Sequence, residues 1–429
     1  MPLQIIIIGA GAAGCFAAIQ IKRLRPEAQV TVLEKLKRPL AKVAITGGGR
    51  CNLTNSFAQV KSLEQVYPRG FRLMKKLFHH FSHEDAYQWF EDNGIRLITQ
   101  EDECVFPASQ DAMEIVNYLT REMKNLGVKL LTDTQVDHII DLSNQKTDGN
   151  SDSSASAVSN SPTGFCVKTN RGEMKADKVL VTTGGHPTGS GYRMLQDLDL
   201  EIIPSHPSLF SFNLSDEHLK SLMGTVVKDA IVFLPGTKLK AEGALLITHW
   251  GISGPAALKL SAYGARILAE QNYVTDISIR WLTDDQETIM LSLHELSLKH
   301  RDKKLTSVYP EAFNARLWEH LLMRANLSVD MRWKELSNKD INRLINTLTN
   351  DIYHVTGKNR FKDEFVTSGG VSLSSLKHKT LEAKNHPGLH FAGEVTDVDA
   401  ITGGFNLQAA WSMAYVAAHA MTEKTSSKE

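Results

Sequence analysis

Six residues near the start of the chain have the types and spacing of a phosphate-binding turn. Residues 9–14 read Gly-Ala-Gly-Ala-Ala-Gly. In such a GxGxxG turn the first glycine permits the tight turn, the second lets a pyrophosphate approach the backbone, and the third lets helix and strand pack closely. The free N–H groups of the following helix then face the phosphates. The turn predicts a dinucleotide site made of Gly9, Ala10, Gly11, Ala12, Ala13 and Gly14.

An acidic residue stands where a dinucleotide site needs one. Glu34 lies at the end of the next apolar run, after residues 29–33. A carboxylate there accepts hydrogen bonds from the ribose hydroxyls of an adenosine and repels a 2′-phosphate, so FAD or NAD is expected rather than NADP. The alternative is a structural glycine turn with an unrelated surface glutamate, but strand, glycines, helix, strand and acid occur in the required order.

A second glycine-rich segment, ITGGGRCNLTN, occupies residues 45–55. Successive glycines let a backbone press against a flat or phosphorylated ligand. Arg50 has the fork geometry to bind a pyrophosphate through two hydrogen bonds. Asn52 and Asn55 offer amides to a flavin ring or its ribityl chain. The residues expected to contact the ligand include Gly48, Gly49, Arg50 and Asn52.

The cysteines suggest neither a metal site nor a disulfide framework. Cys15, Cys51, Cys104 and Cys166 are far apart and form no CxxC pair, so zinc and paired-thiol redox chemistry are not expected. A reducing, cytoplasmic location fits this usage best. Cys51 lies within the glycine-rich segment, where it could be a thiol beside the ligand or a small packing residue. The lack of a resolving partner favours packing.

A third group of site residues lies near the end of the chain. An apolar run, LHFA, leads into Gly393-Glu394, and a double glycine at 403–404 opens an alanine-rich segment. A carboxylate at a strand end can accept hydrogen bonds from ribityl hydroxyls. A helix N-terminus aimed at a flavin pyrimidine would stabilise the charge that gathers there on reduction. The alternative is a capped structural helix. The site residues expected here are Gly393, Glu394, Asp397, Gly403, Gly404 and Asn406.

Two histidines are the acid–base candidates. Gly184, Gly185 and His186 follow the apolar run 178–182, at a strand end where α/β sheets place ligands. His249 precedes Trp250 in a Gly/Pro-rich turn and could line a substrate pocket. Each histidine could equally be an exposed or packing residue. We therefore leave the catalytic residues undetermined, with His186, His249 and Cys51 as candidates.

The elements that must position these motifs follow from hydrophobic periodicity. Residues 4–8 and 29–33 are expected to be buried parallel strands joined by a helix over 12–24, a complete βαβ unit. One continuous helix is expected over 71–93 and another over 111–125. Strands are expected at 128–131, 135–141, 165–169, 178–182 and 389–392, and a helix at 405–421.

The fold class expected is α/β, with a Rossmann-type FAD-binding domain built from both chain ends. The 429 residues are too many for one ordinary core. Residues 1–190 and 361–429 are assigned to the FAD-binding domain. Residues 191–360 are assigned to an inserted domain with a β-rich, barrel-like part and a helical part. Residues 142–164, rich in Ser, Asn, Asp and Gly, are interpreted as a flexible excursion.

Composition excludes several other classes. Lys+Arg and Asp+Glu both number 48, so the formal net charge is zero and nothing in the bulk charge favours nucleic acid or an anionic membrane. A local basic patch is compatible with this balance. The apolar stretch 5–21 carries glycines at turn spacing and lacks a basic leader, so neither a signal peptide nor a membrane span is expected.

Taken together, these motifs resemble the BaiN/YhiN-like NAD(P)/FAD-dependent oxidoreductases, also called the aminoacetone oxidase family. The resemblance runs over most of the chain, and the GGGRCN string and the AGE–DVD–TGG–NLQ series are its most specific parts. It implies a Rossmann-type FAD domain with inserted β-barrel-like and helical domains. It also implies FAD contacts at Gly9, Gly11, Gly14, Glu34, Lys35, Arg50, Cys51, Asn52, Gly393, Glu394, Gly404 and Asn406, with backbone contacts to adenine from Val136.

The chain departs from the family pattern at a few positions. Position 41 is Ala where Arg is usual, and position 405 is Phe where Tyr is common. Residues 371–376 lack the acidic residue usual after GGV, and the 142–164 insert is atypical. The first two departures are compatible with flavin binding. The third can alter the substrate pocket, so a substrate cannot be transferred from a relative.

The function expected is that of an FAD-dependent oxidoreductase, with hydride from NADH or NADPH. The substrate is expected to be a small organic molecule, undergoing either reduction of a C=C bond or enone, or oxidation of an amine or ketone. Flavin supplies the chemistry and the protein supplies placement and electrostatics. Two alternatives stay open: a flavin enzyme that modifies RNA, and a non-catalytic flavin-binding regulator. No nucleic-acid partner is expected from the neutral charge, and the oligomeric state is undetermined.

Overall fold

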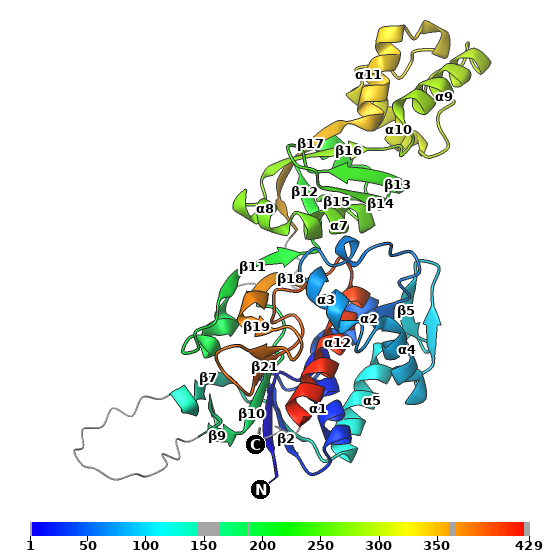
Figure 1. Ribbon diagram of the computed structural model, residues 1–429. Helices are drawn as coiled ribbons and strands as arrows, with labels where there is room; N and C mark the ends of the chain where they lie inside the picture. Colours follow the sequence, from blue (N-terminus) through cyan, green and yellow to red (C-terminus); the bar gives the residue numbers. More distant parts are fainter. Residues whose placement is uncertain (1, 145–162, 187–188, 360–365, 424–429) are drawn as a thin grey trace, which may run out of the picture. The chain divides into compact units, whose positions relative to one another are not determined.

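The computed structural model describes residues 2–144, 163–186, 189–359 and 366–423. The chain forms two compact units, one over 1–206 and 365–429 and the other over 207–364 (Figure 1). The first unit is thus assembled from both ends of the chain. Most of the segment interpreted as a flexible excursion, residues 145–162, lies outside the described residues.

A seven-stranded sheet forms the centre of the first unit. Its order is β19-β20-β21-β10-β1-β2-β6, and the five strands from β21 to β6 run parallel. The predicted α/β class, with one sheet built from both chain ends, is confirmed. The strands are β1 (Gln4–Ile8), β2 (Gln29–Leu33), β6 (Lys129–Leu131), β10 (Lys178–Val181), β19 (Leu376–Lys377), β20 (Glu382–Ala383) and β21 (Leu389–Phe391).

The isoleucine run of β1 explains its place in the middle of the sheet. Ile5 to Ile8 are all buried, and β1 pairs with β2 on one side and β10 on the other. Ile6 and Ile8 join an apolar cluster with the small antiparallel sheet of β7 (Val136–Asp141), β8 (Phe165–Thr169) and β9 (Gly172–Ala176). Alternating side chains turn Ile5 and Ile7 to the opposite face, so both faces of this strand are apolar.

Helices from opposite ends of the chain pack together in the first unit. α1 (Ala12–Leu24) packs against α12 (Gly403–Thr422) and α5 (Ala112–Asn125) (Figure 1). The predicted single helix over 71–93 is wrong, because two helices occur, α3 (Phe71–Leu77) and α4 (His83–Asp92). Ser82 starts α4 through a capping box with Asp85, which ends the continuous helix despite its apolar spacing.

Shorter strands complete the first unit. β3 (Thr54–Asn55), β4 (Leu97–Thr99) and β5 (Cys104–Pro107) form a small antiparallel sheet. β11 (Ile202–Ser208) lies beside β18 (Val366–Val371) in a two-stranded sheet. α2 (Ala41–Gly49) is regular only in its first part, because Thr46, Gly47 and Gly48 depart from helical geometry.

The second unit is a closed antiparallel barrel with a helical extension. The barrel order is β12-β15-β14-β13-β16-β17, and its interior is filled by residues such as Phe212, Ile247 and Ile277. The barrel strands are β12 (Phe212–Leu214), β13 (Val226–Phe233), β14 (Lys240–Thr248), β15 (Gly251–Ser253), β16 (Thr275–Arg280) and β17 (Asp351–Lys358). The helices are α6 (Glu217–Lys220), α7 (Pro255–Tyr263), α8 (Ala265–Glu270), α9 (Gln286–Lys299), α10 (Ala315–Arg324) and α11 (Asn338–Thr349).

A buried polar network ties the helical extension to the barrel wall. Asp351 of β17 accepts hydrogen bonds from Trp281, Tyr353 and Arg324, the last of which lies on α10. His320 of α10 lies 2.9 Å from the Tyr353 hydroxyl. Within the described residues, every helix is too short or too polar to cross a bilayer.

Candidate functional site

The carboxyl ends of three parallel strands bring the predicted motifs together. β1 leads into residues 9–14, β10 into residues 182–186, and β21 into Gly393-Glu394. The Thr182 hydroxyl donates to Gly9 O at 2.8 Å, which joins the first two segments. A Cβ on Gly393 would lie 3.2 Å from Ala13 Cβ, so the third segment also meets the first. Open α/β sheets bind ligands at this edge.

The three glycines of the first GxGxxG turn, Gly9, Gly11 and Gly14, have different surroundings. A Cβ on Gly9 would lie 2.6 Å from Thr182 O, and a Cβ on Gly14 would lie 2.0 Å from Gly9 O. A Cβ on Gly11 would meet no described atom within 4 Å. The outer two glycines are therefore required by the packing of strand and helix. The middle glycine leaves open space in front of the first turn of α1.

Glu34 fastens the turn to the second strand. Its carboxylate accepts hydrogen bonds from Ala10 N at 2.8 Å and Leu36 N at 2.9 Å. Thr134 N donates to Glu34 O at 2.8 Å, which brings the start of β7, with Val136, to the same neighbourhood. Lys35 is exposed beside them. These residues, predicted from distant parts of the sequence, lie at one end of the site.

The second glycine segment forms a left-handed loop after the regular part of α2. Gly47, Gly48 and Gly49 have φ of 60°, 69° and 83°, and a Cβ on either of the last two would meet nothing described within 4 Å. Arg50 then stacks its guanidinium 4.3 Å from the Phe106 ring centre and donates to Gly47 O. The loop thus presents bare backbone, with one arginine held close to it.

This loop meets the N-terminus of α12. A Cβ on Gly404 would lie 2.5 Å from Asn52 Oδ1, and a Cβ on Gly403 would lie 3.1 Å from Thr46 Oγ1. The glycines at 403–404 are therefore needed for two distant segments to approach. The Asn406 side chain bonds only to backbone atoms of Ala400 and Thr402 in the described part of the chain, so it holds the entry to the helix.

A pair of carboxylates closes the site beside β18. Glu394 accepts hydrogen bonds from Thr367 N at 2.8 Å and Lys42 Nζ at 3.0 Å. Asp397 Oδ1 accepts from Gly369 N at 3.1 Å. Gly184 and Gly185 lie against Glu394, and a Cβ on Gly185 would come within 2.9 Å of its Oε1. The predicted residues 184–185 and 393–397 are therefore neighbours.

Several buried polar atoms around these segments lack a protein partner. Buried polar groups are normally hydrogen-bonded, and an unmade bond costs about 1–3 kcal/mol. Four buried polar atoms at the carboxyl edge have no hydrogen-bond partner among the described residues: Asn52 Oδ1, Thr183 Oγ1, His186 Nε2 and Thr402 Oγ1. These atoms need a polar ligand or solvent.

Comparison with known proteins shows the family to which this chain belongs. Residues 3–420 match the family described as "HI0933-like protein Rossmann domain". The chain belongs to the HI0933-like family of FAD-dependent Rossmann proteins. This confirms the resemblance to BaiN/YhiN-like flavoproteins.

Curated relatives of this protein match nearly the whole of its chain. It is 30% identical to the "Ribosomal RNA dihydrouridine synthase" of Escherichia coli, over 98% of each chain. It is 27% identical to the protein of that name in Haemophilus influenzae, over 96% of this chain and 97% of the relative. It is 26% identical to the "3-dehydro-bile acid delta(4,6)-reductase" of Clostridium scindens, over 98% of this chain and 99% of the relative.

The residues at the carboxyl edge fit the FAD of an HI0933-like protein. The open space at Gly11 and at Gly48-Gly49 lets a ligand reach the backbone, and the α1 N-terminus offers N–H groups to phosphates. The unpartnered Asn52, Thr183 and Thr402 oxygens offer polar contacts. Two glycine loops and buried polar atoms on one edge suit a long ligand that is both anionic and polar.

His186 and Cys51 lie in this unit, and burial keeps both uncharged. Burial lowers the pKa of His186 to about 4, with Lys35 adding to the effect, so the imidazole is neutral at pH 7. Burial raises the pKa of the Cys51 thiol to about 12. Cys51 also has a φ of 62° and no exposed surface, which favours a packing role. His249 is exposed in the second unit, between β14 and β15, and its role stays a prediction.

Some residues of the site were missed by motif reasoning. Lys42, Thr46 and Thr367 contact or neighbour predicted residues, and Thr183 and Thr402 carry unpartnered oxygens. The sequence does hold one signal for three of them. Thr46, Thr183 and Thr402 each directly precede a glycine of a predicted motif, where a hydroxyl is delivered beside bare backbone.

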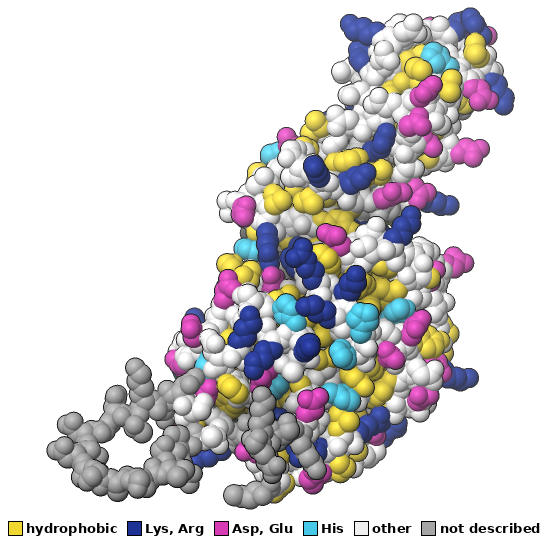
Figure 2. Space-filling model, viewed as in Figure 1, with side chains coloured by type: hydrophobic (Ala, Val, Ile, Leu, Met, Phe, Trp, Pro, Cys, Tyr) yellow, Lys and Arg dark blue, Asp and Glu magenta, His cyan; other side chains and the backbone are white. Residues whose placement is uncertain are grey.

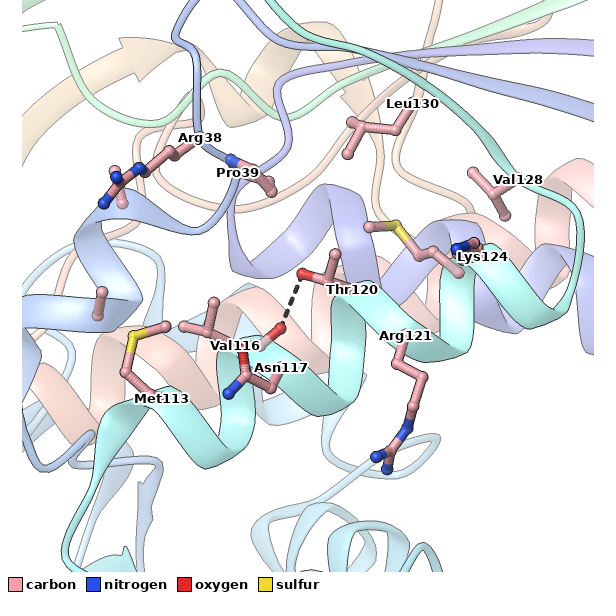
Figure 3. Close-up of a pocket in the computed structure, with 13 residues that line it drawn as sticks. Arg38, Pro39, Met113, Val116, Asn117, Thr120, Arg121, Lys124, Val128 and Leu130 are labelled. Carbon is pink, nitrogen blue, oxygen red and sulfur yellow. Dashed lines mark hydrogen bonds between the residues drawn. The ribbon is translucent and has the colours of Figure 1, made fainter.

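A cavity of about 920 Å³ lies elsewhere in the first unit, between α2, α5 and β6 (Figure 3). Met113, Val116 and Leu130 are among its apolar lining residues, and Arg38 and Arg121 also line it. None of its thirteen described lining residues is a predicted site residue, and none is acidic, a histidine or a cysteine. The cavity therefore offers no acid–base pair for redox chemistry.

Proposed function

We propose that this protein is an FAD-dependent reductase that adds hydrogen across the 5,6 double bond of a uridine in ribosomal RNA, with NADH or NADPH as electron donor. The observation that carries the proposal is the 30% identity, over 98% of both chains, to a protein named ribosomal RNA dihydrouridine synthase. A second relative with that name matches over 96% of this chain. The site geometry supports the flavin part of the proposal independently.

The proposed reaction is a conjugate reduction. The C5=C6 bond of uracil is conjugated to the C4 carbonyl, so hydride adds to C6 and a proton adds to C5. NAD(P)H and one proton are consumed, and NAD(P)⁺ and dihydrouridine are formed. When bound, FAD supplies the hydride, and the protein supplies position and electrostatics.

We assign residues of the first unit to each part of the cofactor. Residues 9–14 and the α1 N-terminus would bind the pyrophosphate, with Arg50 as a neighbouring cation. Glu34 would accept hydrogen bonds from the adenosine ribose, and Glu394 from the ribityl chain. The free N–H groups at the start of α12 would stabilise negative charge at the pyrimidine end. The other proposed contacts are Lys35, Val136, Gly184, Gly185, Asp397 and Asn406.

A small conjugated ketone is the second candidate substrate. Its support is the 26% identity to a reductase of a 3-dehydro-bile acid, whose name also describes reduction of double bonds. The two substrate classes share one reaction, hydride addition to a C=C bond conjugated to a carbonyl. We prefer RNA as the substrate because the relative that acts on ribosomal RNA is more similar to this chain than the bile acid reductase is. The neutral net charge argued against RNA, but a sum over the chain hides local patches.

Purified protein, ribosomal RNA and a nicotinamide nucleotide test the proposal together. We expect a yellow protein that releases FAD and is bleached under anaerobic conditions by NADH or NADPH. RNA from cells that lack this protein should gain two hydrogens at a uridine, detected by nucleoside mass spectrometry, only when protein and donor are both present. Reactions without donor, and without protein, are the controls.

The outcomes separate the alternatives. Turnover of a conjugated 3-oxo steroid with unchanged RNA would replace the RNA proposal by the small-molecule one. Bound FAD that no donor reduces, with no acceptor turned over, would favour the non-catalytic regulator. A folded, colourless preparation that does not bind FAD when FAD is added in excess would refute all of these hypotheses.

A further inference from the structure

Two surface segments of the first unit carry only positive charge. Residues 65–83 contain Arg69, two lysines, a second arginine and three histidines but no Asp or Glu. Residues 371–381 contain two lysines and a histidine and also lack acidic residues. In a chain with equal numbers of acidic and basic residues, such segments are a local excess of cations. The basic patch is defined here as Arg72, Lys75, Lys76, His79, His80, Lys377, His378 and Lys379.

The fold joins these two segments into one surface. Lys76 Nζ lies 3.3 Å from His378 Nδ1, so α3 and the turn after β19 are in contact. The patch lysines and Arg72 are exposed, as are His79 and His80. Figure 2 shows Lys, Arg and His side chains gathered over the region where Figure 1 places α3 and β19.

Most cations of the patch are available to an outside partner. Lys377 pairs with Glu382 at 2.7 Å. Arg72, Lys75 and Lys379 form no ion pair with any residue of the described ranges. A surface cation without a local counter-ion attracts anions of a partner, and this attraction weakens with salt.

The patch borders the candidate flavin site. The segment before α3 is fixed by a buried ion pair between Arg69 and Asp399 and by a hydrogen bond from the Tyr67 hydroxyl to Phe405 O at 2.8 Å. Residues 399 and 405 flank the double glycine at the start of α12. Val371, which begins the second segment, is bridged to Thr396, close to Glu394 and Asp397. Both segments of the patch are therefore anchored to residues next to the site.

We propose that the basic patch binds the phosphate backbone of an RNA substrate and so presents a base to the neighbouring site. The inference rests on the proposed function for the identity of the RNA. Lysine and arginine contacts to phosphate position a nucleic acid without reading its sequence.

A charge-reversal variant tests the patch by binding rather than turnover. Lys75→Glu, Lys76→Glu and Lys379→Glu are combined, and a ribosomal RNA fragment is titrated over a range of salt concentrations. Each phosphate contact contributes about 0.7 to the slope of log K against log salt for single strands, so losing three lowers the slope by roughly 2. Affinity at physiological salt should fall at least about tenfold.

The control variant reverses three exposed lysines of the second unit: Lys228→Glu, Lys238→Glu and Lys240→Glu. It should bind RNA more tightly than the patch variant. FAD content and anaerobic reduction by the nicotinamide donor should match the wild type in the patch variant, which shows that the site is intact. Equal RNA affinity and salt slope in the patch variant and wild type would overturn the proposal, as would an equal loss in the control.

Two further results separate this inference from the proposed function. RNA binding that depends on the patch, without formation of dihydrouridine, would support the patch as an RNA-binding surface and refute the proposed reduction of RNA. Dihydrouridine formation that is unchanged in the patch variant would support the reduction and refute RNA binding by the patch. Patch-dependent binding to anionic phospholipid vesicles, with none to RNA, would assign the patch to a membrane surface and reject the RNA assignment.

Discussion

The two glycine loops of the first unit are constrained differently. In residues 9–14, the outer glycines are forced by the protein itself, because a Cβ on Gly9 or Gly14 would collide with backbone. In residues 47–49, the last two glycines have positive φ yet face no described atom within 4 Å. Each loop thus holds glycines required by packing, such as Gly14, and glycines that face open space, such as Gly11 and Gly48, and the letter G alone does not distinguish these roles.

The largest effect is expected at Gly14. A methyl group there would lie 2.0 Å from Gly9 O and 2.6 Å from Thr182 Oγ1, so α1 must move away from β1. Overpacking of this kind costs about 3 kcal/mol. We expect Gly14→Ala to lower the unfolding temperature and soluble yield of the protein, even without FAD. Unchanged thermal unfolding, measured by circular dichroism, would contradict the packing role.

Gly11→Ala sharpens the comparison with the same change three residues away. Gly11 has a φ of −85°, which alanine adopts freely, and its Cβ would meet no described atom within 4 Å. The apoprotein should keep its stability within about 0.5 kcal/mol. FAD affinity should fall by at least about tenfold, roughly 1.4 kcal/mol, because the methyl group occupies the pyrophosphate approach. Calorimetric titration of the apoprotein with FAD measures this.

Gly48→Ala tests the second loop, with Gly94→Ala as its control. Both glycines have positive φ, 69° and 80°, and a Cβ on either would meet nothing described within 4 Å. Each alanine should therefore cost about 1 kcal/mol of stability from its left-handed backbone alone. Only Gly48→Ala should also weaken FAD binding, because Gly94 follows α4 away from the motifs. Equal FAD affinity in the two variants would remove Gly48 from the cofactor site.

The sequence predicted those parts of the fold that depend on local signals. The bounds of β1, α1 and β2 agree with prediction at every residue, because apolar runs, glycines and a following Pro26 are all adjacent in the chain. The break between α3 and α4 was also encoded locally, in the Ser82–Asp85 capping box. Apolar spacing on both sides of Ser82 hid it, because periodicity reports burial and not continuity.

The rest of the site depends on contacts that no local pattern specifies. Lys42 and Glu394 form an ion pair across 352 positions, and Asn52 approaches Gly404 over a similar separation. Asn406 was assigned to the ligand from its motif, whereas its described bonds are to the backbone that starts α12. Residue type predicts which side chains could bind a ligand. Only the packing of distant segments decides which of their polar atoms are left without a protein partner.

The smallest effect concerns how the site holds His186. Burial lowers its pKa to about 4, against about 6.5 in an unfolded chain, so unfolding takes up a proton between these values. The neutral imidazole therefore adds stability above about pH 6.5, and this contribution is lost as pH falls toward 4. Each such proton contributes at most about 1.4 kcal/mol per pH unit to the slope of the unfolding free energy against pH.

Burial also lowers the pKa of His390 and His320 to about 4, so these histidines contribute to the slope in the same direction as His186. His186→Gln should flatten the fall in unfolding temperature between pH 7 and 5. If this variant follows the wild-type profile, His186 is charged or exposed in solution, and its unpartnered Nε2 cannot be counted among the groups that await a ligand.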